Sequence, residues 1–127
     1  MIIGIGTDIV RIPRMAKNLE RFGDRFAKRI LTPCEMVTFA QHKCPASFLA
    51  KRFAAKEAAA KAMGHGFRNG LMLTHIGVGH DELGKPLLEY SDKATEICDR
   101  LGVGESHISI SDEDEYAIAF VTLVARQ

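Results

Sequence analysis

The sequence predicts an α+β fold: one small domain over residues 1–127, with an antiparallel-rich sheet packed against a long central helix and N-terminal helices. Three observations support this prediction. Strand-like segments lie at both ends of the chain, over residues 1–10 and 107–125. Residues 48–63 contain no glycine, proline or β-branched residue, which favours a helix throughout. A length of 127 residues suits one domain with a real core but is too short for two.

The N-terminal strand has two unlike faces. β-Branched residues occupy positions 3, 5, 7 and 9, while the opposite face carries Gly4, Gly6 and Asp8. Two glycines on one face of a strand indicate the close approach of a ligand or of another backbone. Asp8 lies beyond them on the same bare face. It is either a turn or cap residue, since Pro13 opens a helix soon afterwards, or a ligand for a cation.

Residues 11–29 form a basic segment that is expected to be helical. Its cations recur every three or four residues and would lie along one side of a continuous helix, although Gly23 can break that helix midway. A solvated face is the usual explanation of such a stripe. The functional alternatives are an acidic protein partner and a nucleic acid. The next segment, from Thr32 to Glu35, resembles a capping box that opens a helix ending near His42.

The central helix carries the first candidate for chemistry. Successive steps of four residues place Leu49, Phe53, Glu57 and Lys61 on one stripe, so Glu57 follows two apolar residues along the expected packed face. A carboxylate there costs free energy unless a cation or hydrogen bonds compensate. The alternative is an ordinary Glu–Lys surface pair worth about 0.2–0.5 kcal/mol. Asp8 and Glu57 together could hold a hard divalent cation such as Mg²⁺.

The second half of the chain alternates between strands and a helix. Strands are expected over residues 76–80 and 87–90 around a turn, and a helix is expected from Ser91 to Gly102. A hairpin then pairs residues 107–111 with 116–125 across an acidic turn.

Composition excludes several classes. No apolar run is long enough for a membrane span, and the N-terminus lacks the pattern of a signal peptide. The three cysteines, Cys34, Cys44 and Cys98, are expected to be buried or partly buried thiols of a reducing compartment, so a cytoplasmic location is expected. The histidines form no zinc pattern with them. The chain has neither a dinucleotide fingerprint nor a P-loop.

Three motifs carry a resemblance to a known family. They are Gly4-Ile-Gly-Thr-Asp8-Ile, Phe53-Ala-Ala-Lys-Glu57-Ala-Ala-Ala-Lys61 and Gly84-Lys-Pro86. In this order and at this chain length they resemble holo-acyl-carrier-protein synthase, the short type of 4′-phosphopantetheinyl transferase. The resemblance covers nearly the whole chain and implies the 4′-phosphopantetheinyl transferase fold.

The resemblance implies a reaction. The 4′-phosphopantetheine group of coenzyme A would pass to a serine hydroxyl of an apo acyl carrier protein, giving holo carrier protein and 3′,5′-ADP in support of fatty acid synthesis. Asp8 and Glu57 would bind Mg²⁺, with Mn²⁺ as a possible substitute, and Glu57 is the best candidate to take the serine proton. Lys61 would neutralise phosphate oxygens and completes the catalytic set.

The resemblance also implies contacts to coenzyme A. Arg52 and His107 would hold its 3′-phosphate, while Lys85 and Pro86 would lie beside the adenine and ribose. Lys56 is expected either to point toward a neighbouring subunit or to lie in solvent. The resemblance also implies a homotrimer with the site between subunits, so a homotrimer is expected here.

The acidic carrier protein would dock on the basic stripe, at Arg14, Arg21 and Arg25. Two other classes are compatible with some of the same residues. A small nucleic-acid-binding domain could use the stripe, although the chain has few aromatic residues and no recognised nucleic-acid motif. A Mg²⁺-dependent nucleotide hydrolase would share Asp8 and Glu57 but would need a group to position water, and none is identifiable.

Overall fold

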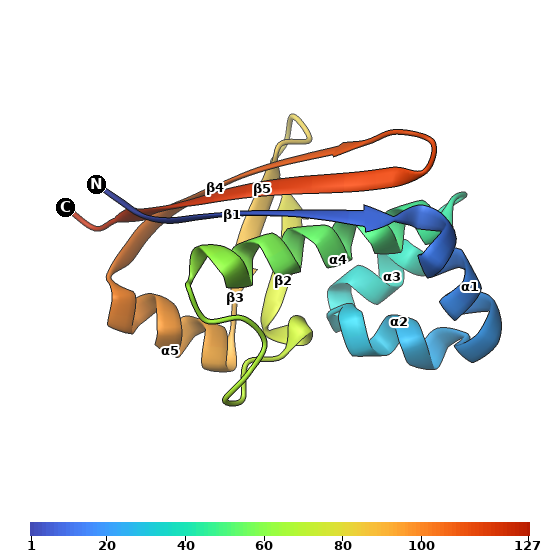
Figure 1. The fold of residues 1–127 in the computed structure, drawn as a ribbon, viewed down its shortest axis with the longest axis horizontal. Coiled ribbons are helices and arrows are strands. Elements are labelled where there is room, and N and C mark those ends of the chain that lie inside the picture. Colours follow the sequence, from blue (N-terminus) through green and yellow to red (C-terminus); the bar gives the residue numbers. More distant parts are fainter.

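The structure, a computed structural model, describes all residues from Met1 to Gln127 and confirms the α+β prediction (Figure 1). Five helices, a short 3₁₀ turn and five strands alternate along the chain. Their bounds are β1 Ile2–Arg11, α1 Ile12–Phe22, α2 Asp24–Ile30, α3 Pro33–Gln41, α4 Pro45–Ala62, η1 Leu73–His75, β2 Ile76–His80, β3 Pro86–Tyr90, α5 Asp92–Leu101, β4 Val103–Asp112 and β5 Tyr116–Ala125.

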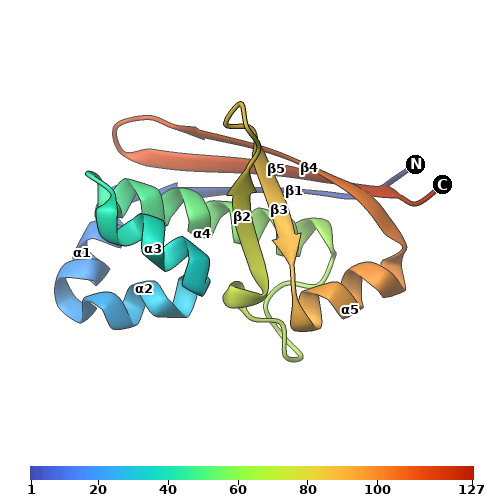
Figure 2. The same cartoon turned by 180° about the vertical axis from the view of Figure 1, so that it is seen from behind.

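The strands form two antiparallel sheets. The larger has the order β1-β5-β4, so the N-terminal strand pairs with the C-terminal strand, and Asp8 lies opposite Ala119. The smaller is the β2–β3 hairpin. In Figure 1 the three long strands form one layer, α4 runs beneath them, and α5 lies at the opposite end of the molecule from α1 and α2. Figure 2 shows the hairpin crossing α4 on the side away from β1.

The close approach predicted for the glycine face of β1 is made by the backbone of α4. A Cβ at Gly4 would overlap the carbonyl oxygen of Ala62, and a Cβ at Gly6 would overlap that of Ala58. Glycine on the strand and alanine on the helix therefore let the two backbones lie almost in contact. Since Asp8 is on the same face of β1, this packing directs it toward α4.

Helix α4 is the centre of the fold. Its alanines are buried nearly all round, between the sheet on one side and α1–α3 with the β2–β3 hairpin on the other. The opposite face of the sheet has no helix on it, and its apolar side chains are exposed: Ile5 is 59% exposed, Ile9 62% and Phe120 45%.

The predicted elements are confirmed with shifts at their ends. Helix α4 begins three residues earlier than the glycine- and proline-free run, with Pro45 in its first turn, and β4 begins at Val103 instead of residue 107. Gly23, at φ +64°, does break the basic helix into α1 and α2. The burial expected for two cysteines was wrong: Cys34 and Cys44 are exposed, because both lie beside helix N-termini at the surface. None of the helices is long and apolar enough to cross a membrane.

Candidate active site

Asp8 and Lys61 meet where β1 passes the last turn of α4. The Lys61 ammonium donates hydrogen bonds to Asp8 Oδ1 and to the carbonyl oxygen of Thr7, each at 3.0 Å. The Asp8 side chain is 16% exposed, whereas that of Lys61 is 53% exposed. The pair therefore lies at the rim of the gap between strand and helix, where a ligand can reach it.

Glu57 completes this group, one turn before Lys61 on α4. Burial raises the pKa of the Glu57 carboxyl above its usual range, the negative charge of Asp8 raises it further, and the positive charge of Lys61 partly opposes both. The structure thus brings together the three residues predicted to be catalytic. We call Asp8, Glu57 and Lys61 the open cluster; its formal charge is −1.

The position of Glu57 refines the sequence analysis. Leu49 is fully buried, but Phe53 and Glu57 are only partly buried and Lys61 is exposed. The stripe therefore leaves the core toward the C-terminal end of α4. Glu57 lies at its edge, half desolvated yet still reachable.

The donor set of the open cluster fits a hard divalent cation. Asp8 and Glu57 supply carboxylate oxygens, and their mutual repulsion is part of why the pKa of Glu57 is raised. No further side chain of histidine, cysteine, aspartate or glutamate joins this pair to form a cluster of three protein ligands. Mg²⁺ characteristically takes one or two carboxylates and draws its other ligands from phosphates and water.

A second charged group lies on another side of α4, and it overturns the prediction for Lys56. Lys56 has no exposed surface, and its ammonium binds Glu35 Oε1 at 2.6 Å. It neither reaches into solvent nor points to another subunit. The sequence analysis missed this because it assigned the packed face to the stripe of Leu49 and Phe53, and the alanines near Lys56 gave no sign that this side is packed as well.

Arg52 belongs to the same group. Its Nε lies 3.7 Å from Glu35 Oε2, and its guanidinium stacks on the ring of Phe48 at 4.4 Å. Burial lowers the pKa of Arg52, and the charge of Glu35 opposes this. We call Glu35, Lys56 and Arg52 the buried cluster; its formal charge is +1.

The predicted coenzyme A residues on the β2–β3 hairpin lie near Arg52. Pro86 pairs with His80 across the hairpin. Arg52 lies beside β2, because the Glu35 Oε2 that accepts from Val78 N–H is 3.7 Å from Arg52 Nε. Burial lowers the pKa of His80 and the positive charge of Arg52 lowers it further, while Asp81 opposes both. The backbone N–H of Lys85 donates to Asp81 Oδ1 at 2.9 Å, which shapes the turn.

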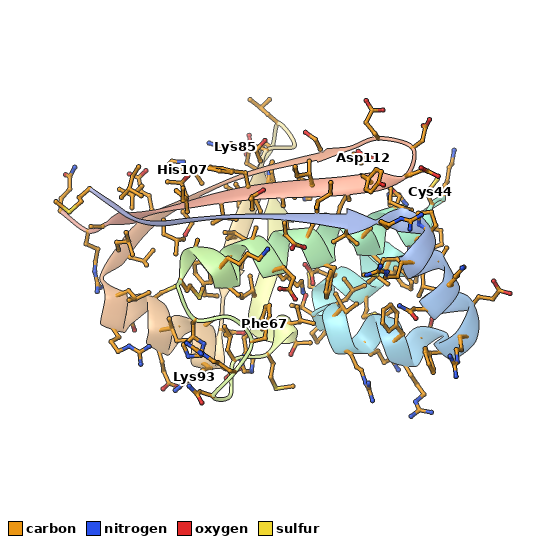
Figure 3. All side chains as sticks on the ribbon, viewed as in Figure 1. Cys44, Phe67, Lys85, Lys93, His107 and Asp112 are labelled. Atoms are coloured by element: carbon orange, nitrogen blue, oxygen red, sulfur yellow. The ribbon has the colours of Figure 1, made fainter.

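His107 is not brought to the open cluster within one chain. Its neighbour on β4, Ile108, is buried toward α4, so His107 lies on the outer face of the sheet, where it is 51% exposed and contacts Glu105 at 3.1 Å. Asp8 lies on the inner face. In Figure 3, His107 on β4 and Lys85 at the hairpin turn both lie on the side of the molecule away from Lys93 on α5.

The three predicted docking arginines are exposed on α1 and α2. Arg14 and Arg21 lie on α1, while Arg25 lies on α2 and lines a hollow of about 320 Å³ with Phe22, Phe26 and Arg29. Phe22 is half exposed, and Arg21 stacks over its ring at 5.0 Å. This surface combines positive charge with apolar contact area.

The sequence predicted only part of the role of Glu35. It does form the predicted capping box, since Glu35 N–H donates to Thr32 Oγ1 and Thr32 N–H donates to Glu35 Oε1. The same carboxylate also accepts from the N–H of Val78, at 2.9 Å, and from Lys56. The capping box accounted for Glu35 fully at the level of the sequence, so nothing there indicated its contacts to Val78 and Lys56.

Comparison with known proteins agrees with this geometry. Residues 4–121 match the 4′-phosphopantetheinyl transferase superfamily. A holo-[acyl-carrier-protein] synthase of Nitrosococcus oceani is 58% identical over 127 residues, covering 100% of this chain and 82% of that protein. One of Hamiltonella defensa is 61% identical over 94% of this chain and 95% of its own.

Solved structures give the same result. Holo-[acyl-carrier-protein] synthase of Neisseria meningitidis superposes with a TM-score of 0.92 at 46% identity, covering 98% of this chain and 99% of that one. The Helicobacter pylori enzyme in complex with coenzyme A gives a TM-score of 0.83 at 33% identity, over 94% and 99% of the two chains. The alternative of a nucleic-acid-binding domain finds no support among these relatives. The chain belongs to the 4′-phosphopantetheinyl transferase superfamily, among the holo-[acyl-carrier-protein] synthases.

Proposed function

We propose that residues 1–127 act as one domain that transfers the 4′-phosphopantetheine group of coenzyme A to a serine of an apo acyl carrier protein, in support of fatty acid synthesis. The observation that carries this proposal is the open cluster, in which two carboxylates and one ammonium share a ligand-accessible rim. A cytoplasmic location, expected from the sequence, remains part of the proposal.

The reaction breaks the phosphoanhydride bond of coenzyme A and forms a phosphoester bond to the serine oxygen. The serine oxygen bonds to the phosphorus that carries the pantetheine arm, and the bond from that phosphorus to 3′,5′-ADP breaks. Glu57, part-buried on α4 beside Asp8, accepts the serine proton. Lys61, exposed and hydrogen-bonded to Asp8, turns its ammonium to the phosphate oxygens and offsets their growing charge.

Mg²⁺, with Mn²⁺ as a substitute, is the cofactor that the open cluster would bind. Asp8 and Glu57 would be its protein ligands. When bound it would neutralise negative charge on the diphosphate. The finding that supports this is the donor set itself: two mutually repelling carboxylates and no third protein ligand.

A homotrimer would complete the coenzyme A site. Asp8 and His107 lie on opposite faces of the three-stranded sheet, so one chain cannot present both to one ligand. The uncovered apolar face, with Ile5, Ile9 and Phe120 exposed, supplies a surface on which another copy can pack. Another copy of the chain would then supply the His107 that the open cluster lacks within its own chain.

The remaining contacts follow from charge. Arg52, with Lys85 and Pro86 on the neighbouring hairpin, would hold the nucleotide end of coenzyme A. The acidic carrier protein would dock at Arg14, Arg21 and Arg25, where the exposed cations surround an apolar hollow.

The test is the intact mass of an apo acyl carrier protein after incubation with this protein, coenzyme A and Mg²⁺. A gain of one phosphopantetheine group that a chelator abolishes is expected. Glu57→Gln should remove the gain, whereas Glu96→Gln, a change on exposed α5, should not. An unchanged carrier mass with folded protein and competent carrier would rule the transferase out.

A further inference from the structure

The buried cluster holds one more positive charge than it needs. Glu35 provides a single negative charge for Lys56 and Arg52, and all three side chains are at least nine-tenths buried. An uncompensated charge is costly in such surroundings. A bound anion at one of the two cations would offset this charge.

Lys56 is not that cation, because its three donors are all taken. The ammonium binds the carbonyl oxygen of Ile30 at 2.5 Å, Glu35 Oε1 at 2.6 Å and the carbonyl oxygen of Leu73 at 3.3 Å. An ammonium has three donors, so none is left for a ligand. Lys56 also has no exposed surface.

Glu35 accepts three hydrogen bonds, and none of them comes from Arg52. Its Oε1 accepts from Thr32 N–H and Lys56, and its Oε2 accepts from Val78 N–H. Arg52 Nε, at 3.7 Å from Oε2, is beyond hydrogen-bonding distance and is buried with no partner.

Arg52 is nevertheless fixed in place. Its guanidinium stacks on Phe48 at 4.4 Å, and it keeps 8% of its surface exposed beside the end of the β2–β3 hairpin. It is therefore the one cation of the buried cluster that a ligand can reach. A guanidinium held in this way at the edge of the buried cluster is suited to a phosphate.

We propose that Lys56 is a positioning residue: by neutralising the charge of Glu35 it keeps Arg52 free to bind the 3′-phosphate of coenzyme A. The inference rests on the proposed function. Without Lys56, Arg52 would be the only cation facing the negative charge of Glu35. Oε2, 3.7 Å from Arg52 Nε, accepts only from Val78 and can accept a second bond, so the guanidinium would move to it. Lys56 itself would touch no substrate.

The test compares binding of 3′,5′-ADP and 5′-AMP, which differ by the 3′-phosphate, by calorimetry on the full chain. Wild-type protein should favour 3′,5′-ADP, and Arg52→Ala should lose this preference. Lys56→Met should also lose about tenfold or more of it, the scale of one charged hydrogen bond. The double variant Glu35→Gln/Lys56→Met should regain the preference, because the neutral amide that replaces the carboxylate carries no charge to capture Arg52.

The recovery in the double variant separates positioning from folding. A merely structural role for Lys56 would weaken both nucleotides alike and would not be rescued by a second change. If Lys56→Met does not fold, Lys56→Gln, which keeps a donor but loses the charge, carries the same expectation.

Each outcome decides the matter. Retained preference in the Lys56 variant, or no recovery in the double variant, overturns the inference. A wild-type protein that modifies the carrier but shows no preference, or an Arg52→Ala variant that keeps it, also overturns it while the proposed reaction stands. A wild-type protein that leaves the carrier unmodified contradicts the proposed function itself.

Discussion

The two charged clusters of α4 differ in burial and in bonding, although Lys56 of one and Glu57 of the other are adjacent in the sequence. Lys56, in the buried cluster, has every donor bonded and no exposure, whereas Glu57, in the open cluster, is half-buried beside a second carboxylate. One residue along a helix turns the side chain by about 100°. Here that rotation separates an internal brace from a site where ligands can bind.

The two clusters also differ in how far their charges are satisfied within the chain. The buried cluster satisfies all but one of its groups internally and holds together α3, α4 and β2 through Glu35. The open cluster combines two carboxylates with one exposed ammonium and so keeps an unmet demand for positive charge. The contrast teaches that the satisfied ion pair supports structure while the unsatisfied one is available for chemistry. Changes at Glu57 and at Lys56 should therefore differ most in their effect on the free energy of unfolding.

The largest effect is expected from Glu57→Gln. It removes the proposed base and a cation ligand, so the rate of carrier modification should fall by on the order of 10²–10⁴-fold. The free energy of unfolding should fall little or rise, because the substitution relieves repulsion from Asp8. Single-turnover mass spectrometry and urea denaturation measure the two quantities. A strongly destabilised Glu57→Gln variant would mean that Glu57, like Lys56, mainly supports the fold, and the two clusters would then not differ in this respect.

Lys56→Met should have the converse effect on stability. Removing one partner of a buried ion pair costs about 3–5 kcal/mol, and movement of Arg52 toward Glu35 would offset part of that cost. The matched control is Lys93→Met, which breaks an exposed Lys93–Glu96 pair of 3.6 Å and should cost roughly 0–1 kcal/mol. Chemical denaturation of both variants checks this. Equal losses would show that burial does not distinguish the two pairs.

Charges outside both clusters should affect the carrier alone. Arg14→Glu with Arg21→Glu should lower kcat/KM for the carrier roughly ten- to hundredfold, mainly through association and most strongly at low salt. The KM for coenzyme A should stay unchanged. A matched double reversal at the exposed Arg68 and Arg100 should alter neither parameter. Steady-state kinetics at two ionic strengths would reveal a general charge effect if the control behaved like the test variant.

Much of this arrangement could be predicted from sequence because it depends on local patterns. Alternation put Gly4, Gly6 and Asp8 on one face of β1, and helical spacing put Glu57 and Lys61 one turn apart. Both patterns survive in the structure. The partner of the glycines could not be predicted, because a bare strand face accepts a ligand or a backbone equally well.

The buried cluster escaped prediction for a different reason. Glu35 lies 21 residues from Lys56, and contacts at that separation leave no periodic signal. Helical spacing could place Lys56 one turn after Arg52, but with alanine on every side it could not say which way that face points. The identity of the packed face comes from α3 and β2, which meet it only in three dimensions.

The smallest expected effect is the pH dependence of stability that Glu57 contributes. Its folded pKa is raised by burial and by Asp8 above the unfolded value, so the folded protein binds this proton more tightly than the unfolded chain does. In chelator, the free energy of unfolding should therefore rise as pH falls through the raised pKa toward the ordinary value of 4.5, and level off below it. Glu57→Gln should remove this rise, and Asp8→Asn should shrink it, since Asp8 causes only part of the shift. Urea midpoints across this pH range measure it. An unchanged profile in both variants would mean that the repulsion distinguishing the open cluster from the buried one has no thermodynamic weight.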